Sequence, residues 1–123
     1  MILVDTSVWV DHLRVGDEAL SRLLDKGQVF VHPFVIGELA LGNLKNREVL
    51  MGLLQELPRT PIASDDEVLR FIDHYALFGT GIGYIDAHLL AATKLAAGSV
   101  LWTRDKRLQA VGSRLGLANS AIH

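Results

Sequence analysis

Hydrophobic and polar positions divide the chain into short apolar runs and longer segments with a helical period. Three short apolar runs, at residues 2–4, 29–31 and 100–102, are typical of strands buried on both faces. The longer segments carry apolar side chains three and four positions apart, which predicts helices. The predicted helices cover residues 6–14, 17–26, 33–41, 46–57, 64–75, 84–97 and 105–114, and a weaker strand candidate lies near 117–122.

Short strands that alternate with helices predict an α/β fold with a mostly parallel sheet covered by helices on both faces. No linker, repeat or low-complexity segment divides residues 1–123, so we expect a single domain. In such sheets, functional sites form beyond the carboxyl ends of the strands. This rule directs attention to Asp5 and to the segment that follows Trp102.

Composition excludes several classes of protein. The chain has no cysteine, which excludes disulfides, thiolate zinc sites and cysteine nucleophiles. No apolar run approaches the roughly 20 residues that a membrane-spanning helix needs. The opening apolar run meets Asp5 at once, so it predicts the start of the fold and no signal peptide. These features favour a cytoplasmic protein without a membrane anchor.

The net charge of −2 argues against a strongly basic nucleic-acid binder, but the charge is unevenly distributed. Residues 1–86 hold 13 acids and 7 bases, whereas residues 87–123 hold 5 bases and one acid. A polyanion could approach the basic part despite the overall charge. A solvated helix surface with ordinary lysines and arginines would explain the same pattern equally well.

Four of the 14 acidic residues stand in apolar surroundings: Asp5, Glu38, Asp86 and Asp105. An ionised carboxylate in such surroundings costs several kcal/mol unless it has a partner. No lysine or arginine stands at helical spacing from Glu38 or Asp86. Together the four acids indicate a shared cation, and oxygen ligands select a hard divalent ion such as Mg²⁺ or Mn²⁺.

Each acid also has a simpler interpretation. Asp5 and Asp105 could each cap the helix that follows. Asp86 stands in the first turn of a helix, where the helix dipole favours a negative charge. Glu38 could be a surface residue of an amphipathic helix. These interpretations stay open for each residue taken singly, but the ordered set of four favours a site.

The ordered motifs resemble the PIN domain, and most closely the VapC-type toxins of prokaryotic toxin–antitoxin pairs. The resemblance is carried by Val-Asp-Thr-Ser-Val-Trp-Val-Asp at residues 4–11 and by Glu38 in an apolar helix. It continues with Gly-Tyr-Ile-Asp-Ala-His-Leu-Leu-Ala-Ala at 83–92 and Leu-Trp-Thr-Arg-Asp at 101–105. Members of the family often carry phenylalanine where this chain has Leu108, which is a change in packing and not in chemistry.

The resemblance implies a three-layer α/β/α sandwich and a metal-dependent endoribonuclease whose products carry a 5′-phosphate and a 3′-hydroxyl. Asp5, Glu38, Asp86 and Asp105 match the family's catalytic acids. We assign Asp5, Asp86 and Asp105 as ligands of Mg²⁺ or Mn²⁺, while Glu38 or Asp105 would orient the attacking water or accept its proton. The hydroxyls that match the family's nearby polar positions belong to Thr6, Ser7 and Thr103.

The resemblance also implies partners: an RNA substrate, a VapB-like antitoxin and a second copy of the chain in a homodimer. Arg104, Lys106 and Arg107 are candidates for contacts with RNA phosphates, although a solvated helix start would explain them as well. Apolar side chains in the 34–57 region could form the surface for a protein partner or belong to the core. These side chains are Leu41, Leu44, Leu50, Leu53 and Leu54.

Of three alternative functions, two lack the residues that they need. A phospho-acceptor receiver domain would need an acidic pair after the first strand and an acid directly after Val31, and the chain has neither. A phosphatase built on Asp-x-Asp fails because position 7 is serine. A non-catalytic PIN-like module that only binds RNA or a protein is the third, although degenerate modules usually lose acids that this chain keeps.

Other conspicuous residues have structural explanations. The glycines at 79, 81 and 83 miss the spacing of a phosphate-binding loop and fit the end of one helix and the start of the next. The five histidines show no metal-ligand spacing, so we expect surface or hydrogen-bonded structural roles for them. Trp9 and Trp102 are expected in the core or an interface.

Overall fold

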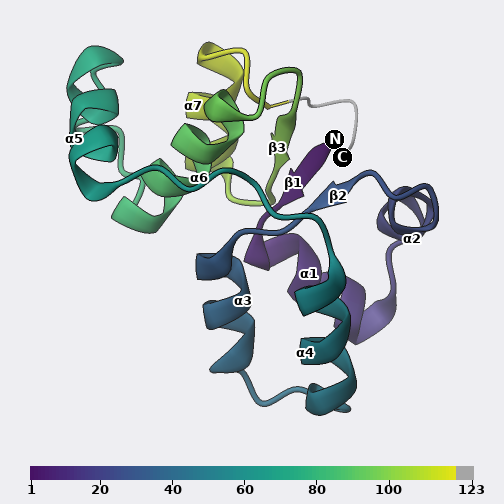
Figure 1. Ribbon diagram of the computed structural model, residues 1–123. Coiled ribbons are helices and arrows are strands. Elements are labelled where there is room, and N and C mark those ends of the chain that lie inside the picture. The colour runs from purple at the N-terminus through teal and green to yellow at the C-terminus, as the bar shows by residue number, and fades with distance from the viewer. Residues whose placement is uncertain (119–123) are drawn as a thin grey trace.

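A computed structural model describes residues 1–118 and has three strands and seven helices in this part of the chain (Figure 1). The strands are β1 (Ile2–Val4), β2 (Val29–Phe30) and β3 (Val100–Trp102). The helices are α1 (Thr6–Val15), α2 (Glu18–Asp25), α3 (Pro33–Ala40), α4 (Arg47–Glu56), α5 (Asp65–His74), α6 (Tyr84–Leu95) and α7 (Lys106–Arg114). The seven predicted helices and the three short apolar strands are present within one or two residues of their expected ends.

The sheet has the strand order β2-β1-β3, and both strand pairs are parallel. Leu3 pairs with Phe30 on one side and with Leu101 on the other. A parallel bridge from Val31 to Arg59 extends the pairing beyond β2, and one from Leu101 to Ala118 extends it beyond β3. The predicted last strand near 117–122 is represented by Ala118, and the rest of that segment lies outside the described residues.

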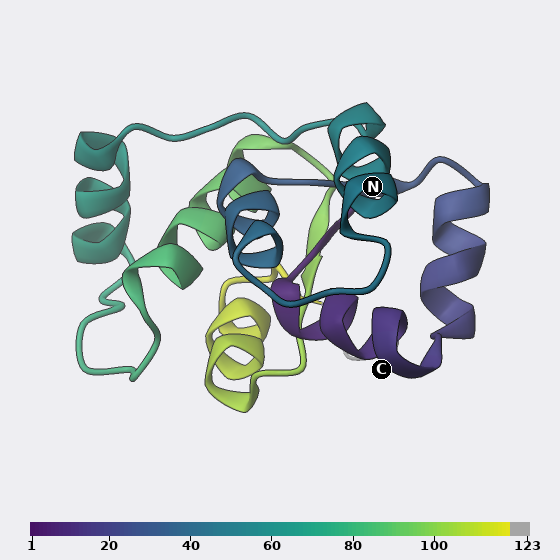
Figure 2. The same cartoon turned by 90° about the horizontal axis from the view of Figure 1, so that it is seen from below.

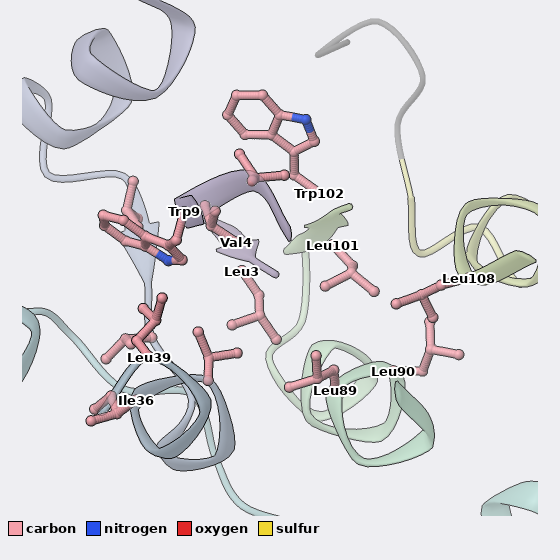
Figure 3. Close-up of a cluster of buried hydrophobic side chains, with 14 of the residues drawn as sticks. Leu3, Val4, Trp9, Ile36, Leu39, Leu89, Leu90, Leu101, Trp102 and Leu108 are labelled. Carbon is pink, nitrogen blue, oxygen red and sulfur yellow. The ribbon is translucent and has the colours of Figure 1, made fainter. Parts of the chain in front are cut away.

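The core is built on both faces of this sheet, which explains why the strands are continuously apolar. Figure 3 shows Leu101 pointing toward Leu89 and Leu90 of α6, whereas Trp102, the next residue, points to the opposite side. Leu3, Leu89, Leu90 and Leu101 have no exposed surface, and Trp102 is 1% exposed. The predicted α/β fold with a parallel sheet between helices is therefore confirmed.

Several helices pack against one another. Helices α3 and α4 contact each other, as do α5 and α6. Helices α2 and α5 lie at opposite ends of the molecule in both views (Figures 1 and 2). No helix among residues 1–118 has the length and apolar character needed to cross a membrane.

Local sequence signals explain where the helices begin. Asp5 directly follows β1 and is the N-cap of α1, and Asp105 closely follows β3 and is the N-cap of α7. The predicted capping box joins Ser64 and Glu67 at the start of α5. Gly79 and Gly81 adopt positive φ angles of 75° and 87° after α5, and Gly83 is the N-cap of α6. The three glycines thus separate two helices, as predicted.

Candidate active site

The four acids singled out in the sequence line one cleft. The cleft has a volume of about 470 Å³ and is lined by Asp5, Thr6, Ser7, Glu38, Gly83, Tyr84, Ile85, Asp86 and Asp105. Two of the acids follow adjacent strands, and the other two come from α3 and from the first turn of α6. The parallel arrangement of β1 and β3 explains why Asp5 and Asp105 meet at the same end of the sheet.

Asp5 lies deepest and is 8% exposed. Its Oδ1 accepts a hydrogen bond of 2.8 Å from the backbone N–H of Thr6. Its Oδ2 accepts hydrogen bonds from the hydroxyls of Ser7 at 3.0 Å and Thr103 at 2.7 Å. These contacts fix the orientation of the carboxylate, and they explain why polar side chains follow β1 and β3.

Glu38 is exposed and is held from a different helix. The Thr6 hydroxyl donates a hydrogen bond of 2.8 Å to its Oε1, which links α1 to α3 across the cleft. Its Oε2 has no hydrogen bond from any residue in 1–118. Glu38 is therefore positioned by a neutral donor and keeps one oxygen for a ligand or a proton.

Asp86 and Asp105 each combine a capping role with a place in the cleft. Asp86 Oδ2 accepts a hydrogen bond of 2.9 Å from the N–H of Gly83, and Asp105 Oδ1 accepts one of 3.0 Å from the N–H of Leu108. In each carboxylate the second oxygen accepts no hydrogen bond within the described chain. The capping interpretation and the site interpretation are thus compatible, because capping occupies one oxygen of each side chain.

The acids of the cleft have no ion-pair partners among residues 1–118. No lysine or arginine in residues 1–118 lies at ion-pair distance from any of the four carboxylates. The pKa of Asp86 is raised, first by burial and then by the negative charges of Asp5, Asp105 and Glu38, although its hydrogen bond from Gly83 opposes this. The negative charges of the other three acids therefore oppose ionisation of Asp86.

The donor set of the cleft fits a hard divalent cation. Its charged groups are all carboxylates, and oxygen ligands are those that Mg²⁺ and Mn²⁺ prefer. No three acidic or histidine side chains in the described part of the chain come close enough to form a complete metal-ligand group. Mg²⁺ does not require one, because it keeps several waters and is commonly held by one or two carboxylates.

The three predicted phosphate-binding cations have different surroundings. The Arg104 guanidinium forms ion pairs of 2.7 Å with Asp11 and 2.8 Å with Asp17, and it lies over the Trp102 ring. Lys106 and Arg107 are exposed in the first turn of α7, next to Asp105. The positive charge of Arg104 is thus paired with two carboxylates. Lys106 and Arg107 are exposed at the surface near the cleft.

One group of residues beside the cleft escaped the sequence analysis. The Tyr84 hydroxyl donates a hydrogen bond of 2.8 Å to Oδ1 of Asp65, and the same oxygen lies 3.2 Å from Nε2 of His88. Tyr84 and His88 are four residues apart, so the sequence places them on one face of a helix. No sequence signal connects them to Asp65, which stands 19 positions before Tyr84.

The expectation for the histidines was only partly right. His32 and His88 are buried, and each has one hydrogen-bonded ring nitrogen. The other nitrogen, Nε2 of His32 and Nδ1 of His88, has no hydrogen-bond partner among the described residues.

Trp9 and Trp102 lie in the core as predicted, at 3% and 1% exposure. Leu108, the residue that departs from the family pattern, is fully buried and serves packing.

Comparison with known proteins agrees with this geometry. The family model described as PIN domain matches residues 2–113. The chain belongs to the PIN domain family. All four acids of this PIN domain fall inside the matched residues. The chain is also 49% identical over 118 residues to proteins named Ribonuclease VapC32 from two strains of Mycobacterium tuberculosis, H37Rv and CDC 1551 / Oshkosh. Each alignment covers 96% of this chain and 95% of its relative.

Proposed function

We propose that this PIN domain is a metal-dependent endoribonuclease and the toxin of a VapBC-type toxin–antitoxin pair. The observation that carries the proposal is the cleft lined by Asp5, Glu38, Asp86 and Asp105, with no lysine or arginine of residues 1–118 at ion-pair distance from them. The name of the Mycobacterium tuberculosis relatives, Ribonuclease VapC32, supports RNA as the substrate. Hydrolysis of a phosphodiester bond is the reaction for which such an acidic site is suited.

Asp5, Asp86 and Asp105 are the residues that would hold Mg²⁺ or Mn²⁺. When bound, the ion supplies a lowered pKa for coordinated water and stabilises negative charge on the phosphoryl oxygens. Glu38 or Asp105 would orient the attacking water or accept its proton, and Glu38 has one oxygen held by Thr6 for this role. Ser7 and Thr103 hold the Asp5 carboxylate in place by hydrogen bonds.

Lys106 and Arg107 are the cations proposed to contact the RNA backbone. Both are exposed at the start of α7, whose N-cap is Asp105, so a phosphate beside the cleft would lie within their reach. Arg107 also packs over the backbone of Gly81, where a Cβ atom would lie 2.9 Å from Arg107 Cδ. We assign Arg104 a structural role, because Asp11 and Asp17 neutralise it.

The proposed antitoxin would cover apolar surface between α1 and α4. A groove of about 720 Å³ there is lined by Leu13, Arg14, Val15, Asn43, Leu44, Lys45, Asn46, Val49, Leu50 and Leu53. Leu41 and Leu53 are 90% and 58% exposed, whereas Leu50 and Leu54 are buried in the core. The leucines of this region thus divide between surface and core. A homodimer in the cytoplasm completes the proposal.

Cleavage of RNA with and without metal tests the function. The purified protein should cut single-stranded RNA with Mg²⁺ or Mn²⁺ and lose this activity in excess EDTA. Asp5→Asn should also abolish cleavage, since asparagine keeps the cap of α1 but removes the charge. Asp25→Asn is the matched control, because Asp25 is an exposed acid at the end of α2 and should leave cleavage unchanged.

Two results would contradict the proposal. Full activity of Asp5→Asn, or full activity in EDTA, would reject the metal-dependent mechanism. RNA that is bound but never cut under any metal condition would favour a non-catalytic PIN-like module. Circular dichroism of each variant would separate lost chemistry from lost folding.

A further inference from the structure

One of the residues that line the acidic cleft is a half-exposed tyrosine. Tyr84 lines the same cleft as the four carboxylates and is 45% exposed. Its position follows from α6, where it is the first residue, two positions before Asp86. A large ring at this place has to be explained, because the proposed chemistry of the cleft uses only carboxylates, hydroxyls and a cation.

The Tyr84 ring is held by one contact from α5 and one from its own helix, α6. Its hydroxyl donates to Asp65 Oδ1 at 2.8 Å, and Asp65 is the first residue of α5. His88 packs edge-to-face against the ring with a centroid distance of 4.7 Å, and its Nε2 lies 3.2 Å from the same Asp65 oxygen. These contacts restrict rotation of the ring before any ligand arrives, which lowers the entropic cost of binding.

A second aromatic ring also packs against His88. Phe34 meets His88 edge-to-face with a centroid distance of 4.8 Å and is 37% exposed. Phe34 stands four residues before Glu38, so the two share one face of α3. His88 itself is 2% exposed. The buried imidazole thus contacts two partly exposed rings, of which Tyr84 lines the cleft.

The polar end of Tyr84 is occupied, so its exposed ring surface is what a ligand would meet. A planar apolar group is the natural partner of a fixed aromatic ring. Unpaired RNA bases are commonly recognised by stacking on aromatic side chains, and such stacking tolerates any base because every base has a π-face. A base next to the cleaved phosphate would come to this wall of the cleft if the phosphate lies at the carboxylates.

We propose that Tyr84 is a stacking platform for a nucleobase of the RNA next to the cleaved bond, and that Asp65 and His88 are the residues that position its ring. This inference rests on the proposed ribonuclease function. It adds a contact with substrate outside the acidic cluster and the cations of α7. It also predicts that one nucleotide of the substrate contributes through its base and not only through its phosphate.

Abasic substitution of the RNA tests the platform. The probe is a single-stranded RNA oligonucleotide with one bond cut by the wild-type protein, together with versions that carry an abasic nucleotide at each position flanking that bond. For one of these positions, the abasic change should lower wild-type kcat/KM about tenfold. Tyr84→Ala should lower kcat/KM for the intact RNA by about the same factor. For the Tyr84→Ala protein, the abasic RNA should have the same kcat/KM as the intact RNA, because the stacking contact is already absent.

Matched variants separate stacking from folding. Tyr84→Phe keeps the ring and should keep its sensitivity to the abasic position, while Phe78→Ala removes a 69% exposed ring outside the cleft and should change nothing. With the non-cleaving Asp5→Asn protein, 2-aminopurine at the sensed position should be quenched on binding. The quenching should disappear when Tyr84→Ala is added.

The outcomes are distinct. If wild-type protein cuts the RNA but Tyr84→Ala loses activity by the same factor on intact and abasic RNA at every position, Tyr84 is only structural and the inference is overturned. If wild-type protein cuts no RNA, the proposed function itself fails and the inference fails with it.

Discussion

The hydroxyl of Thr103 donates a hydrogen bond of 2.7 Å to Oδ2 of Asp5, although the two residues are 98 positions apart. The same hydroxyl accepts a hydrogen bond of 3.0 Å from the backbone N–H of Asp105. One side chain therefore connects the acid that follows β1 with the acid that follows β3. This connection makes the carboxyl end of the sheet a rigid base for the cleft.

Replacing Thr103 tests whether this connection matters for catalysis. Thr103→Val keeps the shape but removes both hydrogen bonds, so Asp5 should lose part of its fixed orientation. We expect RNA cleavage to fall by about 10–100-fold, the usual effect of removing a residue that orients a metal ligand. Thr103→Ser restores the hydroxyl and should recover most of the activity. Equal activity of Thr103→Val and wild type would show that Asp5 needs no support from β3.

The raised pKa of Asp86 predicts how the stability of the metal-free protein depends on this side chain. The pKa of Asp86 is raised in the folded protein, mainly by burial, so the folded state binds the proton more tightly than the unfolded state does. Stability then falls as pH rises through this raised pKa, and the charged carboxylate destabilises the protein at neutral pH. In EDTA, Asp86→Asn should therefore raise Tm by a few degrees, since its amide oxygen can keep the hydrogen bond from Gly83.

Adding Mn²⁺ should reverse the order of the two Tm values, so that wild type melts above Asp86→Asn. Metal that binds only the folded state stabilises wild type by mass action, whereas Asp86→Asn should gain little. Differential scanning fluorimetry with and without Mn²⁺ measures both effects. A lower Tm of Asp86→Asn in EDTA would mean that its carboxylate stabilises the fold and is not under electrostatic strain.

His32 predicts a second dependence on pH. It is fully buried, and its Nδ1 accepts a hydrogen bond of 3.0 Å from the N–H of Phe34, which requires an unprotonated nitrogen. Burial, with a contribution from the charge of His88, lowers the pKa of His32 from 6.5 to about 4. The unfolded chain therefore takes up the proton first as pH falls below 6.5, and stability decreases towards pH 4.

The expected loss through His32 is at most about 3 kcal/mol over this interval, and urea unfolding at several pH values measures it. His32→Asn is the matched variant, because asparagine can cap α3 and does not titrate. Its free energy of unfolding should depend less on pH between 6.5 and 4 than that of wild type. An identical pH dependence of the two proteins would assign the effect to other groups.

Because Arg104 is held in ion pairs, we expect it to contribute less to RNA binding than Lys106 and Arg107 do. With a non-cleaving Asp5→Asn protein, Lys106→Ala and Arg107→Ala should each reduce the slope of log K against log salt by about 0.7, the value for one contact with single-stranded RNA. Arg104→Ala should leave this slope unchanged and lower stability by about 1 kcal/mol or less, because the pairs are partly exposed. A reduced slope for Arg104→Ala would show that RNA displaces Asp11 and Asp17.

Much of this architecture could be predicted because the relevant signals are local. Each strand is a short apolar run, and the helix starts follow from caps such as Ser64 with Glu67. The four acids could be identified because each stands among apolar residues in its own segment. The parallel sheet then requires the acids that follow β1 and β3 to meet, since both strands end at the same edge.

What could not be predicted depends on contacts between distant segments. The sequence near Arg104 indicates a cation available to RNA, but Asp11 and Asp17 come from α1 and from the residue before α2. The link between Tyr84 and Asp65 depends on how α5 packs on α6. The division of Leu53 and Leu54 between surface and core depends on the rotation of α4, which adjacent leucines do not specify.

Binding of Mn²⁺ measured by isothermal titration calorimetry tests most directly whether these carboxylates act together. Wild type should bind Mn²⁺ with a measurable heat. Asp5→Asn and Asp86→Asn should each bind Mn²⁺ at least roughly tenfold more weakly than wild type does. Asp25→Asn should bind like wild type. Wild-type affinity in both Asp5→Asn and Asp86→Asn, or no binding by wild type, would contradict a shared metal site in this cleft.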